Sequence, residues 1–74
     1  MQIANNLIYL RKKHNLNRME LSHRLNMNES IIRAVENGVS KNPRIDTIIK
    51  LTKYFEISID DFVYKKLEAT SNIT

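Results

Sequence analysis

The stretch that decides the fold is "LNRMELSHRLNMNESIIRAVENG", residues 16–38. Twice in it an Asn follows an apolar residue, at Leu16-Asn17 and at Met27-Asn28, and another apolar residue stands five positions after the first. An Asn in that place caps a helix N-terminus, and the two apolar residues pack on each other across the cap. The pattern therefore predicts helices that begin near Arg18 and Glu29.

Signals at the ends of these two helices predict a short connection between them. The first helix must stop before Asn28, so only Asn26 and Met27 separate it from the next cap. Asn tolerates the left-handed conformation that a tight corner needs, and Gly38 is the expected residue just after the second helix. Two short helices with such a corner form a helix-turn-helix. Taken alone this is a weak signal, because any helical bundle contains similar corners.

The rest of the chain is also helical in pattern. Ile57-Ser58 repeats the capping pattern and predicts a helix near Ile59, and Glu20 and Asp61 stand where they complete capping boxes. Two further helices are indicated by apolar residues at helical spacing, the first over residues 2–13 with Ile3, Leu7 and Leu10, and the other after Pro43 with Ile45, Ile48, Ile49, Leu51, Thr52 and Phe55. We expect a compact all-α domain of five helices over residues 1–67 and a frayed tail over residues 68–74.

Size and composition limit the possible functions. A domain of 74 residues buries only about 60% of its unfolded surface, which makes a catalytic cleft hard to build. The chain has no Cys, and His14 and His23 lack a third ligand at metal spacing. We therefore expect no enzyme, metal site or cofactor. No apolar run approaches the roughly 20 residues that span a bilayer, and nothing resembles a signal peptide, so we expect a cytoplasmic protein without a membrane partner.

Positive charge is concentrated in the first half of the chain. The net charge is +4, and the segment from Arg11 to Arg44 holds eight basic residues against three acids. From Ile45 onward four basic residues face five acids. This distribution suits a polyanion bound on one side of the molecule, although a solvated helix face would also produce it.

A family resemblance makes the helix-turn-helix specific. The segments "LRKKHNLNRMELSHRLNMNESIIRAVENG" and "NPRIDTIIKLTKYFEISIDDF" resemble the Cro/repressor-type (XRE-type) helix-turn-helix family of bacterial and phage regulators. The likeness covers residues 3 to about 64. At its end, "EISIDDF" stands where family members usually have a segment that contains Gly-Val-Ser. It implies a repressor-like fold and a sequence-specific regulator of transcription, by expectation a repressor, that binds a double-stranded DNA operator. The helix from Glu29 would be the recognition helix, the one that lies in the major groove.

The outward face of that helix holds the candidate base-reading residues. At about 100° per residue, Ile32 and Val35 define its buried side, and the opposite side and flank present Glu29, Ser30, Arg33 and Ala34 to base edges. Two interpretations of Glu29 stay open: it accepts a hydrogen bond from a cytosine amino group, or it only stabilises the helix N-terminus through the helix dipole.

Other residues are candidates for DNA phosphates or for structure. We expect phosphate contacts from Arg18, Asn37, Lys41 and Arg44. Arg18 starts a helix whose free N–H groups favour an anion. The resemblance implies that an Arg in the loop that contains Lys41 and Arg44 lies near the minor groove, and that Asn37 either contacts a phosphate or serves only as a C-cap. It also pairs Arg11 with Glu36 as a structural clamp between the first and third helices.

The size of the module predicts a homodimer. One such module offers about 600–1,000 Å² to DNA, which rarely suffices for tight specific binding. The expected dimer surface is Val63, Tyr64 and Leu67, which add apolar area beyond the expected core positions Ile59 and Phe62. An alternative function uses the same fold as an anti-repressor or antitoxin, in which Glu29 and Ile31 meet a protein, and a protein antagonist is a possible further partner.

Overall fold

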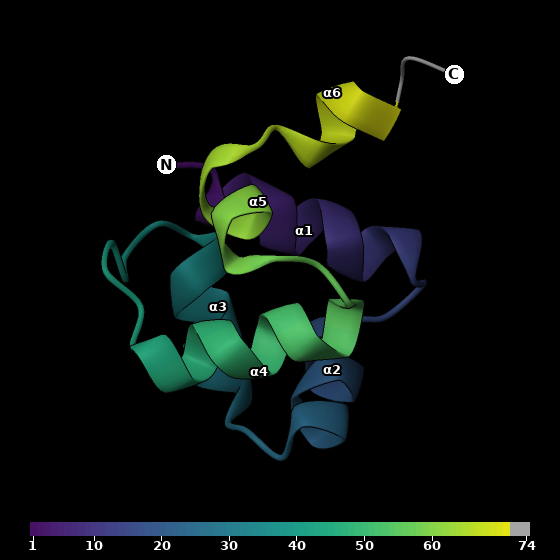
Figure 1. The fold of residues 1–74 in the computed structure, drawn as a ribbon. Helices are drawn as coiled ribbons and strands as arrows, with labels where there is room; N and C mark the ends of the chain where they lie inside the picture. The colour runs from purple at the N-terminus through teal and green to yellow at the C-terminus, as the bar shows by residue number, and fades with distance from the viewer. Residues whose placement is uncertain (72–74) are drawn as a thin grey trace.

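The computed structural model describes residues 1–71 of the chain, and this part contains six helices (Figure 1). They are α1 (Ile3–Lys13), α2 (Arg18–Leu25), α3 (Glu29–Glu36), α4 (Ile45–Phe55), α5 (Ile59–Tyr64) and α6 (Leu67–Ser71). No strand occurs among these residues, which confirms the predicted all-α fold. The predicted starts at Arg18, Glu29 and Ile59 coincide with the first residues of α2, α3 and α5.

The number of helices needs a correction from five to six. Residues 68–71, where we expected a frayed tail, lie in α6. The backbone N–H of Leu67 donates to Oδ1 of Asn6 at 3.2 Å, and the Leu67 side chain packs against the core. These partners lie 61 residues apart in the chain, so no local pattern could reveal the anchor. The remaining expected tail, residues 72–74, lies outside the described residues.

Side chains cap two of the helices as predicted and leave a third uncapped. Asn17 and Glu20 form a complete capping box at α2, and the hydroxyl of Ser58 accepts from the N–H of Asp61 at α5. The capping box predicted at α5 is incomplete, because the Asp61 side chain makes no return hydrogen bond to the Ser58 backbone. Asn28 has the extended backbone of an N-cap residue, but its side chain makes no capping hydrogen bond. The expected side-chain cap of α3 is therefore wrong, and the exposed Asn28 side chain faces solvent.

Left-handed residues make the two connections around α3. Asn26 has φ 52° and ψ 53°, and the next amide, that of Met27, donates to the carbonyl oxygen of Ser22 at 2.9 Å. This turns the chain from α2 into α3 within three residues. Gly38 has φ 75°, and its N–H donates to the carbonyl oxygen of Val35 at 3.2 Å. Both residues occupy the positions expected from their tolerance of positive φ.

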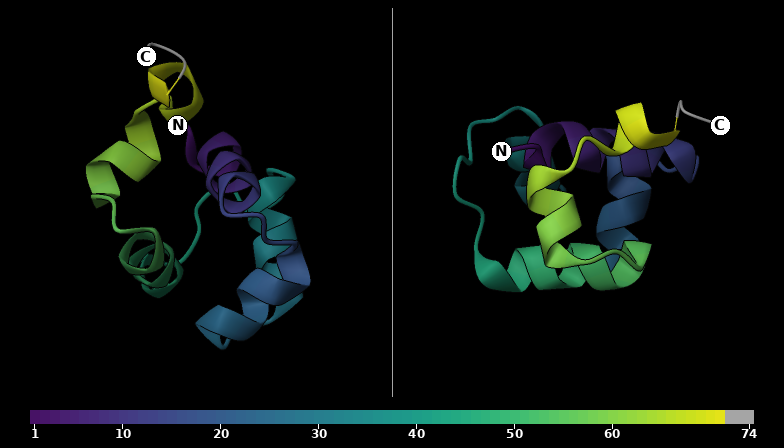
Figure 2. Two further views of the ribbon diagram at one scale, coloured as in Figure 1. Left: turned by 90° about the vertical axis from the view of Figure 1, so that its right-hand side faces the viewer. Right: turned by 45° about the horizontal axis from the view of Figure 1, so that its top comes forward.

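The core lies between two groups of helices. The left view of Figure 2 shows α1, α2 and α3 on one side and α4 with α5 on the other. Both groups contribute side chains that are almost fully inaccessible to solvent: Leu7, Leu21, Ile32, Leu51 and Phe62. Each such side chain contributes about 1.5–3 kcal/mol by its burial. The expectation that Ile59 is a core residue is wrong, because it begins α5 at the rim and is 41% exposed.

No helix within residues 1–71 combines the length and the apolar character needed to cross a membrane.

Candidate nucleic-acid interface

The core fixes which face of α3 is free. Ile32 and Val35 are buried, whereas Ser30 and Arg33 are exposed and Ala34 is half-buried. These three lie on the side of the helix opposite to its two core residues, as the helical rotation of the sequence predicts. In Figure 1, α2 and α3 follow each other through the loop at the bottom of the view. The fold therefore presents a polar helix face beside the helix-turn-helix corner.

An ion pair joins two of the four candidate base-reading residues. Nη2 of Arg33 lies 2.9 Å from Oε1 of Glu29, one helical turn earlier, and the side chains are 53% and 21% exposed. The separate roles expected for Glu29 and Arg33 did not include this contact. Their spacing of four, with the acid on the N-terminal side, is a recognised signal for such a pair and could have revealed it.

Glu36 is the centre of a second and more deeply buried charge cluster. Its side chain is 0% exposed, and it accepts hydrogen bonds from Nε of Arg11 at 2.7 Å and from Nη2 of Arg11 at 3.0 Å. Nη1 of Arg11 also donates to the carbonyl oxygen of Leu16 at 2.9 Å. The pair that the resemblance singled out is thus in contact, and it joins α1 to α3.

Arg18 takes part in the same cluster, and this contact was not expected from the sequence. Its Nε donates to Oε1 of Glu36 at 3.0 Å, and its side chain is 38% exposed. The two residues are 18 positions apart, and no sequence signal connects them. One buried carboxylate therefore binds two guanidinium groups, and the Arg18 group reaches the surface at the start of α2.

The remaining candidate phosphate contacts lie around the connection from α3 to α4. Asn37, Lys41 and Arg44 are exposed, and the Asn37 amide donates to the carbonyl oxygen of Arg33 as the C-cap of α3. Nε of Arg44 lies 3.4 Å from Asp46, but the two side chains are 87% and 68% exposed. An ion pair so open to water constrains its members little.

A hollow of about 270 Å³ separates the outward face of α3 from this connection. Ser30, Ile31 and Ala34 line it from α3, and Pro43 and Arg44 line it from the opposite side. Ile31 is 39% exposed there. The candidate base-reading face and the candidate phosphate residue Arg44 thus border one shared concave surface.

The three expected dimer residues have different environments. Val63 and Leu67 are partly buried against the core of their own chain, and the carbonyl oxygen of Val63 accepts from the N–H of Gln2 at 2.6 Å. Tyr64 is 70% exposed. Of the three, Tyr64 offers the most surface to a second subunit, because α6 draws Leu67 toward α1.

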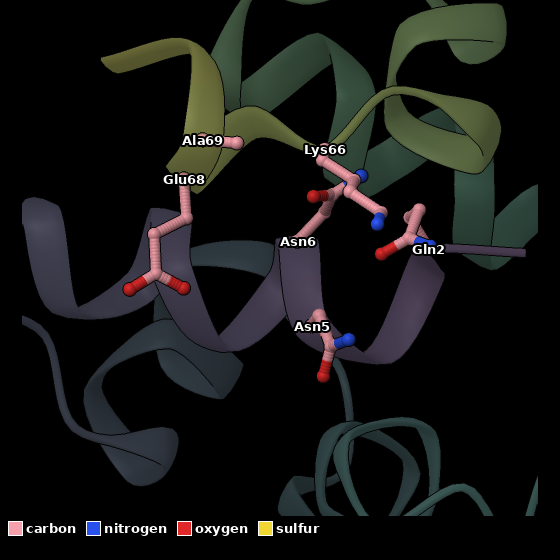
Figure 3. Close-up of a pocket in the computed structure, with 6 residues that line it drawn as sticks. All are labelled: Gln2, Asn5, Asn6, Lys66, Glu68 and Ala69. Atoms are coloured by element: carbon pink, nitrogen blue, oxygen red, sulfur yellow. The ribbon is translucent and has the colours of Figure 1, made fainter. Parts of the chain in front are cut away.

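A second hollow, of about 360 Å³, lies between α1 and α6 (Figure 3). Asn6 points from α1 toward the chain at Lys66, and its Nδ2 donates to the carbonyl oxygens of Phe62 and Lys65 at 2.7 Å each. Its Oδ1 accepts from the Leu67 amide. Because these bonds use both the donors and the acceptor of Asn6, this side chain is a structural junction and not a ligand-binding group.

The described residues contain no group of three His, Asp or Glu side chains that could hold a metal ion. Within the same part of the chain, every buried side-chain nitrogen or oxygen atom has a hydrogen-bond partner. The polar groups left for a ligand are therefore those on the surface, including the outward face of α3.

The fold and this surface define a helix-turn-helix protein. The model of the helix-turn-helix family matches residues 7–62, and the chain belongs to the XRE-type helix-turn-helix family. A relative from Methanocaldococcus jannaschii, described as an uncharacterized HTH-type transcriptional regulator, is 34% identical over 64 residues, which cover 85% of this chain and 96% of that protein. No solved structure gives a significant match. Membership in this family supports a DNA-binding transcriptional regulator.

Proposed function

We propose that the protein is a sequence-specific repressor that binds a double-stranded DNA operator as a homodimer, with α3 in the major groove. The observation that carries the proposal is the outward face of α3, where Ser30 and Arg33 are exposed beside the half-buried Ala34. In a helix-turn-helix this face meets base edges. A hydroxyl, a guanidinium and a methyl group are suited to base atoms, to guanine and to the thymine methyl respectively.

Contacts to phosphates would orient α3 on the duplex. Arg18, Lys41 and Arg44 supply positive charge at the start of α2 and in the connection to α4, and Asn37 supplies an amide. Arg18 is the best prepared of these, since Glu36 binds its Nε while the side chain remains 38% exposed. Such contacts fix register and orientation without reading sequence.

Repression by occupancy fits the size of the chain, which needs a second copy to cover an operator. We infer that the dimer forms through the α5 region, where Tyr64 is 70% exposed and Ile59 is 41% exposed. The repressor would act in the cytoplasm and would be of bacterial or phage origin.

A second candidate function is protein binding by the same face, as in an anti-repressor or antitoxin. The observation that favours it is the apolar wall of the hollow beside α3, where Ile31 is 39% exposed. The charges around the hollow favour DNA, because Arg44 lines it and Lys41 lies in the adjoining loop. A protein antagonist of the repressor would use this same surface.

The salt dependence of binding tests the proposal. The binding of selected duplexes would be measured by fluorescence anisotropy at salt concentrations from about 50 to about 200 mM, a range over which phosphate contacts make the binding constant fall steeply. Arg18, Lys41 and Arg44 from two subunits make six cationic contacts, so at about −0.9 per phosphate the log–log slope should be about −5. Absence of duplex binding at low salt would reject the repressor and favour the protein-binding alternative.

A further inference from the structure

The ion pair on α3 has a chemical consequence beyond helix stability. Glu29 on the flank of α3 and the exposed Arg33 contact each other at 2.9 Å, with side chains that are 21% and 53% exposed respectively. A surface pair of this spacing contributes only a few tenths of a kcal/mol to a helix. It does, however, place a carboxylate and a guanidinium side by side at the position where α3 would meet base edges.

Each member of the pair keeps free hydrogen-bonding capacity. A guanidinium has five N–H donors, and the contact with Glu29 involves only Nη2 of Arg33. Among the described residues, Oε2 of Glu29 accepts no hydrogen bond. The pair therefore offers donors from Arg33 next to an acceptor from Glu29 without having to separate.

This arrangement matches one kind of base pair. In the major groove a G·C pair presents two acceptors, N7 and O6 of guanine, followed by the donor N4 of cytosine. An A·T pair presents an acceptor, a donor and an acceptor in that order. Two donors and an acceptor satisfy the G·C edge completely, whereas at an A·T edge donor meets donor and the carboxylate meets an oxygen.

We propose that Glu29 and Arg33 act as one unit that reads a G·C pair in each operator half-site, and that Glu29 sets the selectivity by rejecting A·T at that position. Arg33 contacts the guanine, and Glu29 both orients the guanidinium and accepts from the cytosine amino group. The inference rests on the proposed function. It gives Glu29 a positive role in recognition, in contrast to an acid that only complements the dipole of α3.

Charge balance supports a role in selectivity rather than in affinity. Glu29 cancels the charge of Arg33, so the pair adds little to the general attraction of α3 to phosphates. At a wrong base pair the carboxylate would face acceptor atoms and the phosphate backbone without a donor. Specificity obtained by penalising the wrong partner is a general device in recognition.

The test compares Glu29→Gln with the parent and with Glu56→Gln. Glu56 is exposed at the C-terminal end of α4, so its variant removes the same charge away from α3. Operators would be selected from a random duplex library. Binding would then be measured on the best operator and on a set of copies, in each of which A·T replaces a single G·C pair. Thermal melting would verify that each variant is folded.

The parent should prefer G·C over A·T at one position of the half-site by roughly tenfold to a hundredfold, as expected of a good bidentate contact. Glu29→Gln should reduce this preference below about threefold, chiefly by tightening the A·T complex, and Arg33→Gln should reduce it by weakening the G·C complex. Glu56→Gln should keep the parental preference.

Two results would overturn the inference. One is that Glu29→Gln changes binding to the G·C and A·T duplexes by the same factor, which would make Glu29 a source of general repulsion only. The other is that the parent shows no G·C preference that depends on Arg33. Both differ from failure of the proposed function itself, in which the folded parent binds no duplex at low salt.

Discussion

Replacing Arg11 with Met would test the charge cluster that joins α1 to α3. The variant keeps an apolar stem but removes three hydrogen bonds, two to Glu36 at 2.7 and 3.0 Å and one to the carbonyl oxygen of Leu16 at 2.9 Å. Glu36 is 0% exposed, so the substitution leaves a buried carboxylate with fewer hydrogen-bond partners. Breaking a buried pair in this way costs about 3–5 kcal/mol.

Arg18 reduces that cost, because its Nε still donates to Glu36 at 3.0 Å. We therefore expect Arg11→Met to lower the free energy of unfolding by about 2–4 kcal/mol. A chain of this size has a total stability of about 4–11 kcal/mol, and each kcal/mol shifts its melting temperature by about 4–8 °C. The expected decrease in melting temperature is roughly 8–32 °C.

Circular dichroism melts at one fixed protein concentration would measure the effect, since the proposed dimer would make the midpoint depend on concentration. Two matched variants compare this cost with the loss of more exposed contacts of an Arg. Arg18→Met loses one hydrogen bond of a 38% exposed side chain and should cost about 1 kcal/mol. Arg44→Met loses a 3.4 Å contact between exposed groups and should cost less than about 0.5 kcal/mol. Equal midpoints for all three variants, or an Arg11→Met midpoint like that of the parent, would refute the reasoning.

Four further variants test other parts of the molecule. Lys41→Ala should weaken binding to all duplexes by similar factors and reduce the salt slope by about one unit per subunit; an altered base preference in a binding selection would contradict this. Gly38→Ala should cost about 1 kcal/mol in urea unfolding because φ is 75° there and an added Cβ meets no atom within 4 Å, so strain alone acts; an unchanged stability would count against it. Tyr64→Asp should shift the proposed dimer toward monomer in light scattering, and a dimeric mass that the substitution leaves unchanged would exclude this surface. Asn6→Leu should cost about 2–4 kcal/mol, because it leaves the Phe62 and Lys65 carbonyl oxygens and the Leu67 amide unpaired; a melting temperature equal to that of the parent would show that the junction is dispensable.

The proposed interface separates two uses of charge. Glu36 with Arg11 and Arg18 is an interior cluster that fixes how α3 is held, whereas Glu29 with Arg33 lies on the exposed face of the same helix. Mutations in the first should act mainly on stability, and mutations in the second mainly on base preference. Arg18 belongs to both kinds, since its partly exposed guanidinium is also a candidate phosphate contact.

The sequence by itself determined α1 to α5 and the corner of the helix-turn-helix. Helix starts follow from residues that act within one turn, such as Asn17 with Glu20, and the corner follows from the tolerance of Asn26 for positive φ. The outward face of α3 was predictable for the same reason, because the burial of Ile32 and Val35 orients every other side chain of a regular helix. The cap of α2 and the corner join residues close together in the chain, and the outward face of α3 follows from the regular period of its own residues.

Only the tertiary structure decided the contacts between distant segments. Arg18 reaches Glu36 because α2 packs on α3, and α6 forms on α1 because Asn6 binds the Leu67 amide. The exposure of Ile59 likewise depends on where α5 meets the core. A local pattern shows which residues are apolar or charged, but packing decides which residues become partners. A buried group such as Glu36 must have its hydrogen bonds satisfied, and the donors are those that the fold brings near.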